Sequence, residues 1–145
     1  MSNVGEIERV TQNRIVKLFK NHLKYDYLGD LKDKENKNIN PKLLKTFLQK
    51  QEYSEKIITR ALRELDQAAA MGDGCSLYDA NKDVYRILRY GIKVKEGAGE
   101  QNQTVWLINW AEPEKNNYAI AEEVTVKGEN TKRPDVVLYI NGIAI

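Results

Sequence analysis

The sequence predicts a mixed α/β domain in which helices come first and a mixed β-sheet follows. Apolar residues recur at helical spacing up to about residue 91, and beyond it short segments alternate between apolar and polar residues. The order of the elements favours a sheet that the first helix covers. The 145 residues suffice for one buried core, so we expect a single domain over residues 1–145.

The composition excludes several classes of function. One cysteine, Cys75, and one histidine, His22, allow neither an internal disulfide nor a Cys/His zinc site. A Cys-His nucleophilic pair is disfavoured, because His22 falls on the apolar side of a helix and Cys75 in a Gly-rich turn. No apolar stretch approaches the roughly 20 residues that span a bilayer, and the N-terminus lacks a signal segment. We therefore expect a cytoplasmic protein without a membrane partner.

Residues 5–23 predict an amphipathic helix. At about 100° per residue Glu8 falls within its apolar face, where it reaches water at the rim, pairs with a lysine, or points into a site. Residues 24–40 predict a loop, because charged and asparagine residues dominate them. The apolar face of the helix is formed by Ile7, Val10, Ile15, Leu18, Phe19 and His22.

Three further helices are predicted before residue 91. One begins at Pro41, which suits a first-turn position, and the next follows Ser54, a candidate N-cap. The third covers residues 77–91. Asp79 or Asn81 could cap it, and its common apolar face consists of Val84, Tyr85 and Leu88.

The second half predicts strands at residues 92–94, 104–109, 118–126, 135–140 and 143–145. Glu122 lies on the bulkier apolar face of its strand. A position at a strand end or sheet edge would explain a charged residue on that face without any function. Residues 135–140 do not alternate and therefore predict a central strand covered on both faces. Asn141-Gly142 favours a type I′ turn that folds residues 143–145 back antiparallel.

Asp135 stands at the start of that central strand, after Pro134. A buried carboxylate there requires a cation or hydrogen bonds, and a salt bridge to Lys132 or Arg133 would suffice. The hairpin also brings residues just beyond Ile145 across from Asp135. A metal-dependent nuclease gathers ligands for Mg²⁺ in this way, so both interpretations of Asp135 stay open at this point.

Five segments together carry a resemblance to a known family. The chain closely resembles, over nearly all its length, the N-terminal part of the restriction (R, motor-nuclease) subunit of type I restriction enzymes. The segments are ERVTQNRIVKLF (8–19), LYDANKDVYRILRYG (77–91), WLINW (106–110), AIAEEVTVKG (119–128) and RPDVVLYINGIAI (133–145).

The resemblance implies an endonuclease domain of the P-D…(D/E)-x-K fold, here truncated in the catalytic hairpin. Pro134 and Asp135 would be the P-D half of the motif, with Asp135 a catalytic Mg²⁺ ligand. The acid and lysine of the second half would follow Ile145. Glu8 is similar to the first-helix glutamate of many such nucleases, a candidate group beside the metal. ATP would act only in a helicase-like motor, and no G-x-x-x-x-G-K-[ST] loop occurs in this chain.

We expect contacts with double-stranded DNA phosphates from basic residues, although each could be an ordinary surface side chain. The candidates are Lys132 and Arg133 beside Asp135, and Lys93, Lys95 and Lys127 near strand ends. The family further implies separate methylation and specificity subunits as partners. The alternative is a non-catalytic DNA-binding or subunit-docking module, a short form or decoy of the restriction subunit. In either case we expect little or no nuclease activity from this chain alone.

Overall fold

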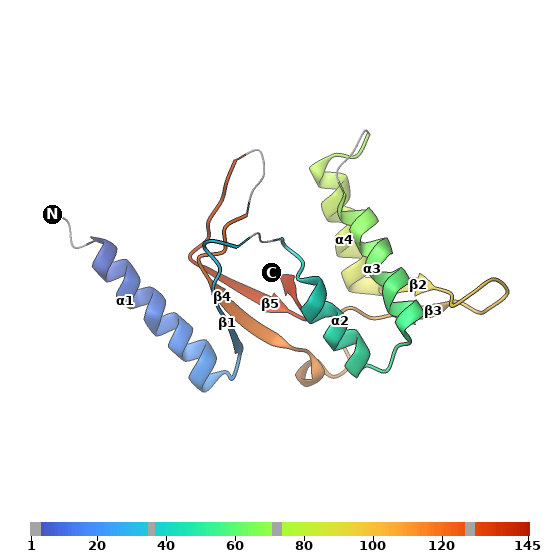
Figure 1. Cartoon of the computed structure of the whole chain (residues 1–145), viewed down its shortest axis with the longest axis horizontal. Coiled ribbons are helices and arrows are strands. Elements are labelled where there is room, and N and C mark those ends of the chain that lie inside the picture. Colours follow the sequence, from blue (N-terminus) through green and yellow to red (C-terminus); the bar gives the residue numbers. More distant parts are fainter. Residues whose placement is uncertain (1–3, 35–36, 71–73, 127–129) are drawn as a thin grey trace. The chain divides into compact units, whose positions relative to one another are not determined.

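The computed structural model describes residues 4–34, 37–70, 74–126 and 130–145. The chain divides into two compact units, of which Met1–Asn40 with Asn117–Ile145 form the first and Pro41–Asn116 the second (Figure 1). The described residues form four α-helices and a mixed sheet, which confirms the predicted α/β class. The predicted single domain stays a prediction.

A four-stranded sheet is the framework of the first unit. Its strands are β1 (Asp26–Asp30), β4 (Tyr118–Glu122), β5 (Val136–Ile140) and β6 (Ile143–Ala144). They lie in the order β1-β4-β5-β6, with β1 parallel to β4 and the other neighbours antiparallel. β5 is thus an interior strand, as predicted, but of its five residues only Tyr139 is buried and the others are half-buried. A core cluster on this sheet consists of Ala119, Ala121, Val124 and Tyr139.

The predicted hairpin between β5 and β6 is present. Asn141 and Gly142 have φ angles of 52° and 83°, and a type I′ turn requires positive φ at both central residues. The Asn141 side chain is fully buried, and its Oδ1 accepts a hydrogen bond of 2.7 Å from the backbone N–H of Asn117. The turn is therefore tied to the residue that precedes β4.

β1 falls within residues 24–40, so the prediction of a loop there is wrong over Asp26–Asp30. Tyr27 pairs with Ile120 of β4, and Asp30 pairs with Glu122 after an irregularity in the register. The sequence DYLGD has acids at both ends and a glycine, so it lacks the alternation that signals a strand. Pairing with a distant strand creates this element, and local sequence does not reveal it.

The first helix exists, but its predicted inward face is wrong. α1 (Val4–Lys17) continues as a π-helical segment, η1 (Leu18–His22). Ile7 and Val10 are 65% and 67% exposed, whereas Gln12 and Val16 are buried. Three other residues of the predicted apolar face, Ile15, Leu18 and His22, are exposed as well. The buried side, which includes Gln12 and Val16, lies roughly a third of a turn away around the helix.

The second unit consists of the three other helices and a two-stranded antiparallel sheet. Its elements are α2 (Pro41–Lys50), α3 (Glu55–Ala69), α4 (Leu77–Tyr90), β2 (Ile92–Val94), β3 (Gln103–Val105) and the 3₁₀ turn η2 (Pro113–Lys115). The predicted cap of α3 is confirmed, since Ser54 Oγ accepts a hydrogen bond of 3.3 Å from the Ile57 N–H. The largest fully buried apolar side chains of this unit are Leu44, Leu48, Ile57, Ile58, Leu65, Leu107 and Val105.

Three details of the second unit differ from the prediction. Ser76, not Asp79 or Asn81, is the N-cap of α4, and Asp79 completes a capping box with it. Tyr85 is 66% exposed and so does not share the buried side of α4 with Val84. The strand predicted at 104–109 ends at Val105, although the residues after Trp106 are buried.

Candidate functional site

Three strand ends meet at one end of the four-stranded sheet. β1 and β4 run parallel and end there, at Asp30 and Glu122, and β5 begins there at Val136. Asp135 precedes β5, and its backbone oxygen accepts a hydrogen bond of 2.9 Å from the N–H of Glu123. The sheet thus places the acidic side chains of three segments, and those of α1, around one end.

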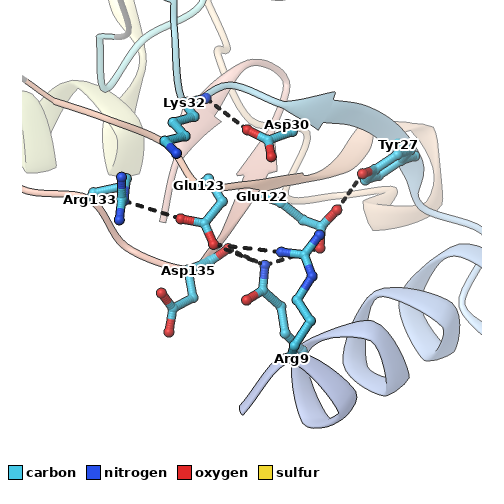
Figure 2. A network of polar contacts seen from close by, with 9 residues as sticks. Arg9, Tyr27, Asp30, Lys32, Glu122, Glu123, Arg133 and Asp135 are labelled. Carbon is cyan, nitrogen blue, oxygen red and sulfur yellow. Dashed lines mark hydrogen bonds and ion pairs between the residues drawn. The ribbon is translucent and has the colours of Figure 1, made fainter. Parts of the chain in front are cut away.

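Glu122 is a buried carboxylate, with 6% of the residue exposed. Its Oε1 accepts a hydrogen bond of 3.0 Å from Gln12 Nε2 on α1, and its Oε2 accepts one from the Tyr27 hydroxyl on β1 (Figure 2). A buried carboxylate is costly unless hydrogen bonds compensate it, and here two donors from two elements do so. The strand-end position expected for Glu122 is confirmed, and the residue joins α1 and β1 to β4.

Glu122 raises the pKa of the Tyr27 hydroxyl. Its hydrogen bond to Glu122, together with burial and the negative charges of Glu122 and Asp30, raises the pKa of Tyr27 to about 12. Tyr27 therefore stays a neutral hydrogen-bond donor throughout the physiological range.

Glu123, the next residue, also faces α1, because its Oε1 accepts a hydrogen bond of 3.5 Å from Gln12 Nε2. Its φ of 53° lies in the left-handed region, which ends the regular pairing of β4. Its carboxylate forms ion pairs with Arg133 Nε at 3.2 Å and with Arg9 Nη1 at 3.8 Å. Arg133 is thus held by Glu123, and the alternative of a salt bridge from Arg133 to Asp135 is wrong for this structure.

The Asp135 side chain is exposed, and Figure 2 shows its carboxylate directed away from that of Glu122. Among the described residues it has neither a hydrogen-bond donor nor a cationic partner within contact distance. Burial therefore does not penalise its charge, contrary to the expectation for the start of a buried strand. An accessible, unengaged carboxylate at the end of a sheet is chemically free to bind a cation or to face a phosphate.

Glu8 is exposed on α1, one helical turn before Gln12. It therefore lies near the side of the helix that Gln12 turns toward Glu122. Within the described ranges, no three His, Cys, Asp or Glu side chains come close enough to hold one metal ion. The described residues thus bring Asp135 and Glu8 into no complete metal-binding group.

The predicted DNA-binding residues lie in different surroundings. Lys132 is exposed and its backbone pairs with Val126, whereas Lys127 lies outside the described residues. Lys93 and Lys95 line a hollow of about 540 Å³ in the second unit, which α3 and β2 share. Two arginines of α3 line it too, Arg60 and Arg63, and Glu64 is the acid among its lining residues. We call Arg60, Arg63, Lys93 and Lys95 the basic hollow.

Comparison with known proteins decides the family. The sequence model of the family described as "Type I restriction enzyme R protein N terminus" matches residues 7–145. The chain belongs to this family. The match covers both compact units and confirms the resemblance seen in the sequence. Neither the curated proteins nor the solved structures compared with the chain gave a match. None of the helices in the described residues has the length and apolar character needed to cross a membrane.

Sequence reasoning missed two residues of this R-protein N-terminal region that organise the site. Gln12 lies four residues after Glu8 and so shares its side of the helix. A search for polar residues on that side could have identified Gln12. Tyr27 carried no signal, because its segment reads as a loop until it pairs with β4. Both donate to Glu122, for which the sequence suggested no firm role.

Proposed function

We propose that this chain is the nuclease region of a type I restriction R subunit, which hydrolyses DNA phosphodiester bonds in the intact restriction complex. The family match over residues 7–145 is the observation that carries the proposal. A P-D…(D/E)-x-K fold agrees with the antiparallel β5-β6 hairpin that follows Pro134 and Asp135. The same membership supports methylation and specificity subunits as partners, and a cytoplasmic complex in which ATP is used by a separate motor region.

Asp135 is the residue proposed to bind Mg²⁺. Its exposed carboxylate has no competing partner among the described residues, and Mg²⁺ prefers hard oxygen ligands. Glu122 is a poorer candidate, because Gln12 and Tyr27 already occupy its two oxygens. One accessible carboxylate is too few for a complete site, so the described residues do not by themselves fit the ion. Glu8 remains the candidate for a second acidic group.

Binding to double-stranded DNA is proposed to rest on phosphate contacts. Lys132 and Arg133 flank Asp135 in sequence, and the basic hollow gathers four cations in the second unit. Guanidinium and ammonium groups bind phosphates without reading bases, which suits a subunit whose target is chosen elsewhere. The affinity should therefore fall steeply as salt rises.

The cleavage proposal is tested in the full restriction complex with a plasmid that carries its recognition site. Asp135→Asn should abolish cleavage and leave ATP hydrolysis and DNA binding unchanged, whereas the control Asp33→Asn, at another exposed aspartate, should cleave normally. The isolated 145-residue chain should show little or no Mg²⁺-dependent cleavage. Normal cleavage by the Asp135→Asn complex would refute the assignment of Asp135.

A non-catalytic DNA-binding module is the second candidate, favoured by the basic hollow and by the lack of a three-ligand metal group in the described residues. It predicts that the isolated chain binds a DNA duplex in the presence of a chelator. Replacing Lys93 and Lys95 by glutamine should then weaken binding and lower the salt dependence by about 0.9 per lost phosphate contact. Replacing Lys42 and Lys56, exposed lysines of the same unit, is the matched control.

A further inference from the structure

The solvent-facing side of α4 alternates aromatic and cationic side chains. Tyr78, Lys82, Tyr85 and Arg89 follow one another at spacings of four, three and four residues, so they share one face of the helix. Tyr78 and Tyr85 are 73% and 66% exposed. We call these four residues, together with Trp110, the α4 stripe.

Folding of the second unit does not account for this face. α4 buries Ala80 and partly buries Val84, Ile87 and Leu88, which lie on the opposite side of the helix. The capping box of Ser76 and Asp79 begins the helix without any help from the tyrosines. Large aromatic rings that remain in water next to cations are typical of binding surfaces.

Trp110 extends the stripe at its C-terminal end. Its Nε1–H donates a hydrogen bond of 2.9 Å to the backbone oxygen of Leu88, which fixes the indole against the helix. The guanidinium carbon of Arg89 lies 5.6 Å from the centre of the indole ring, a cation–π contact. The indole stays 49% exposed. A ring held in one orientation loses little conformational entropy when a ligand stacks on it.

Cations outnumber carboxylates on this side of α4. Lys82 and Arg89 belong to the stripe, and Arg86 lies beside them on the helix. Asp79 is a carboxylate near Lys82 at the helix start, where its Oδ2 accepts hydrogen bonds of 3.1 and 2.7 Å from the N–H and hydroxyl of Ser76. Asp83 follows Tyr78 by five residues, so it lies more than a quarter turn away from the stripe. The stripe thus complements a polyanion that also offers flat ring faces.

We propose that the α4 stripe binds single-stranded DNA, with bases on the aromatic rings and phosphates on Lys82 and Arg89. Stacking on aromatic side chains beside cations is the general means of binding single strands without sequence preference. In a duplex the bases are already stacked on one another, so the tyrosines would have no role. A protein partner fits less well, because the stripe itself contains no aliphatic side chain. It extends about 16 Å along the helix, which a handful of nucleotides covers.

The test measures fluorescence anisotropy of a labelled oligo-dT of about 20 nucleotides with the whole 145-residue chain and a chelator. The double substitution Tyr78→Ala with Tyr85→Ala should weaken binding at least about tenfold, because it removes two aromatic rings on which bases can stack. Tyr78→Phe with Tyr85→Phe keeps both ring faces and should bind within about twofold of the wild type. Leu77→Ala removes an exposed apolar side chain of the same helix outside the stripe and should have no effect.

Two further measurements separate stacking from simple charge attraction. Lys82→Gln and Arg89→Gln should each lower the slope of log affinity against log salt by about 0.7, whereas the double tyrosine-to-alanine variant should leave the slope unchanged. Oligo-dT should quench tryptophan fluorescence in the wild type, and Trp110→Phe should remove most of that quenching. The variant with Lys93 and Lys95 of the basic hollow replaced by glutamine supplies the opposite control. It should weaken binding to a duplex more than binding to oligo-dT.

Equal affinities of the wild type and the double tyrosine-to-alanine variant for oligo-dT would overturn the proposal. The stripe would then be a surface for phosphates alone or for a protein. Circular dichroism shows whether the variants remain folded, as expected for side chains that face water. The chelator prevents metal-dependent cleavage, so this outcome is independent of whether the chain acts as part of a nuclease.

Discussion

Gln12 on α1 and Glu122 at the end of β4 are joined by a hydrogen bond of 3.0 Å between side chains that are both buried. The same amide nitrogen lies 3.3 Å from the backbone oxygen of Asp135. A single glutamine thus contacts the buried acid and the backbone of the residue proposed to bind the metal. On α1 Gln12 and Val16 are buried, whereas the apolar residues Ile7 and Val10 face water.

Gln12→Ala should lower the free energy of unfolding by about 1–3 kcal/mol, because it removes a hydrogen bond to a buried charged group. Urea denaturation followed by circular dichroism measures the change. Asn13→Ala is the matched control, as it removes an amide from the neighbouring exposed position of the same helix and should change stability by less than about 0.5 kcal/mol. Equal effects of the two substitutions would show that the contact with Glu122 contributes nothing.

The elements that the sequence predicted well are those specified by nearby residues. α3 begins at Ser54, whose side chain reaches an N–H three residues later, and the β5-β6 turn requires only the backbone freedom of Asn141-Gly142. The family was visible because five segments spread along the chain together carry the resemblance. These signals do not depend on how distant parts of the chain meet.

The parts that the sequence did not predict depend on distant contacts. β1 becomes a strand through pairing with β4, and on the buried face of α1 the polar Gln12 contacts Glu122 of β4. Asp135 is likewise exposed, and Arg133, the cation two residues before it in sequence, pairs with Glu123 instead. A helical wheel or a strand pattern contains no information about such partners.

Glu122→Gln should lower the pKa of Tyr27 from about 12 toward its ordinary value of 10.0, because the carboxylate that accepts its hydrogen bond raises it most. The measurement is the tyrosinate absorbance during alkaline titration. Tyr27→Phe identifies the contribution of this residue among the eight tyrosines. An unchanged late-titrating phase in Glu122→Gln would contradict the assigned cause.

The raised pKa of Tyr27 also predicts how stability depends on pH. The folded state keeps the proton up to about pH 12, whereas the unfolded state loses it near pH 10. The contribution of the Tyr27 hydroxyl is therefore fully present below pH 10 and is lost as the pH rises from 10 toward 12. Urea midpoints should fall less steeply over this interval in Tyr27→Phe than in the wild type. Equal slopes of the urea midpoint against pH in the two proteins would mean that Tyr27 has the same pKa in the folded and unfolded states.

The pair of Arg133 and Glu123 should contribute only about 0.2–1 kcal/mol to stability, since half of the arginine side chain is exposed. A double-mutant cycle with Arg133→Gln and Glu123→Gln measures this coupling. It should shrink further as salt rises from low to about 1 M, because exposed charges are screened. A coupling above about 2 kcal/mol that resists salt would show that the pair is shielded from water.

Gly91→Ala should destabilise the second unit by roughly 2 kcal/mol or more. Gly91 ends α4 with φ 78° and ψ 178°, a conformation that side chains rarely adopt, and an added Cβ would lie 2.7 Å from Thr104 Cγ2 and 3.0 Å from the Val105 oxygen. Gly97→Ala is the control, because nothing lies within 4 Å of its added Cβ and its φ is not in the left-handed region. Thermal and urea unfolding should separate the two variants clearly. Equal stabilities of the two variants would mean that the junction between α4 and β2 can shift to accept a side chain. The close approach of β3 to Gly91 would then not be needed to hold the small sheet against the helix.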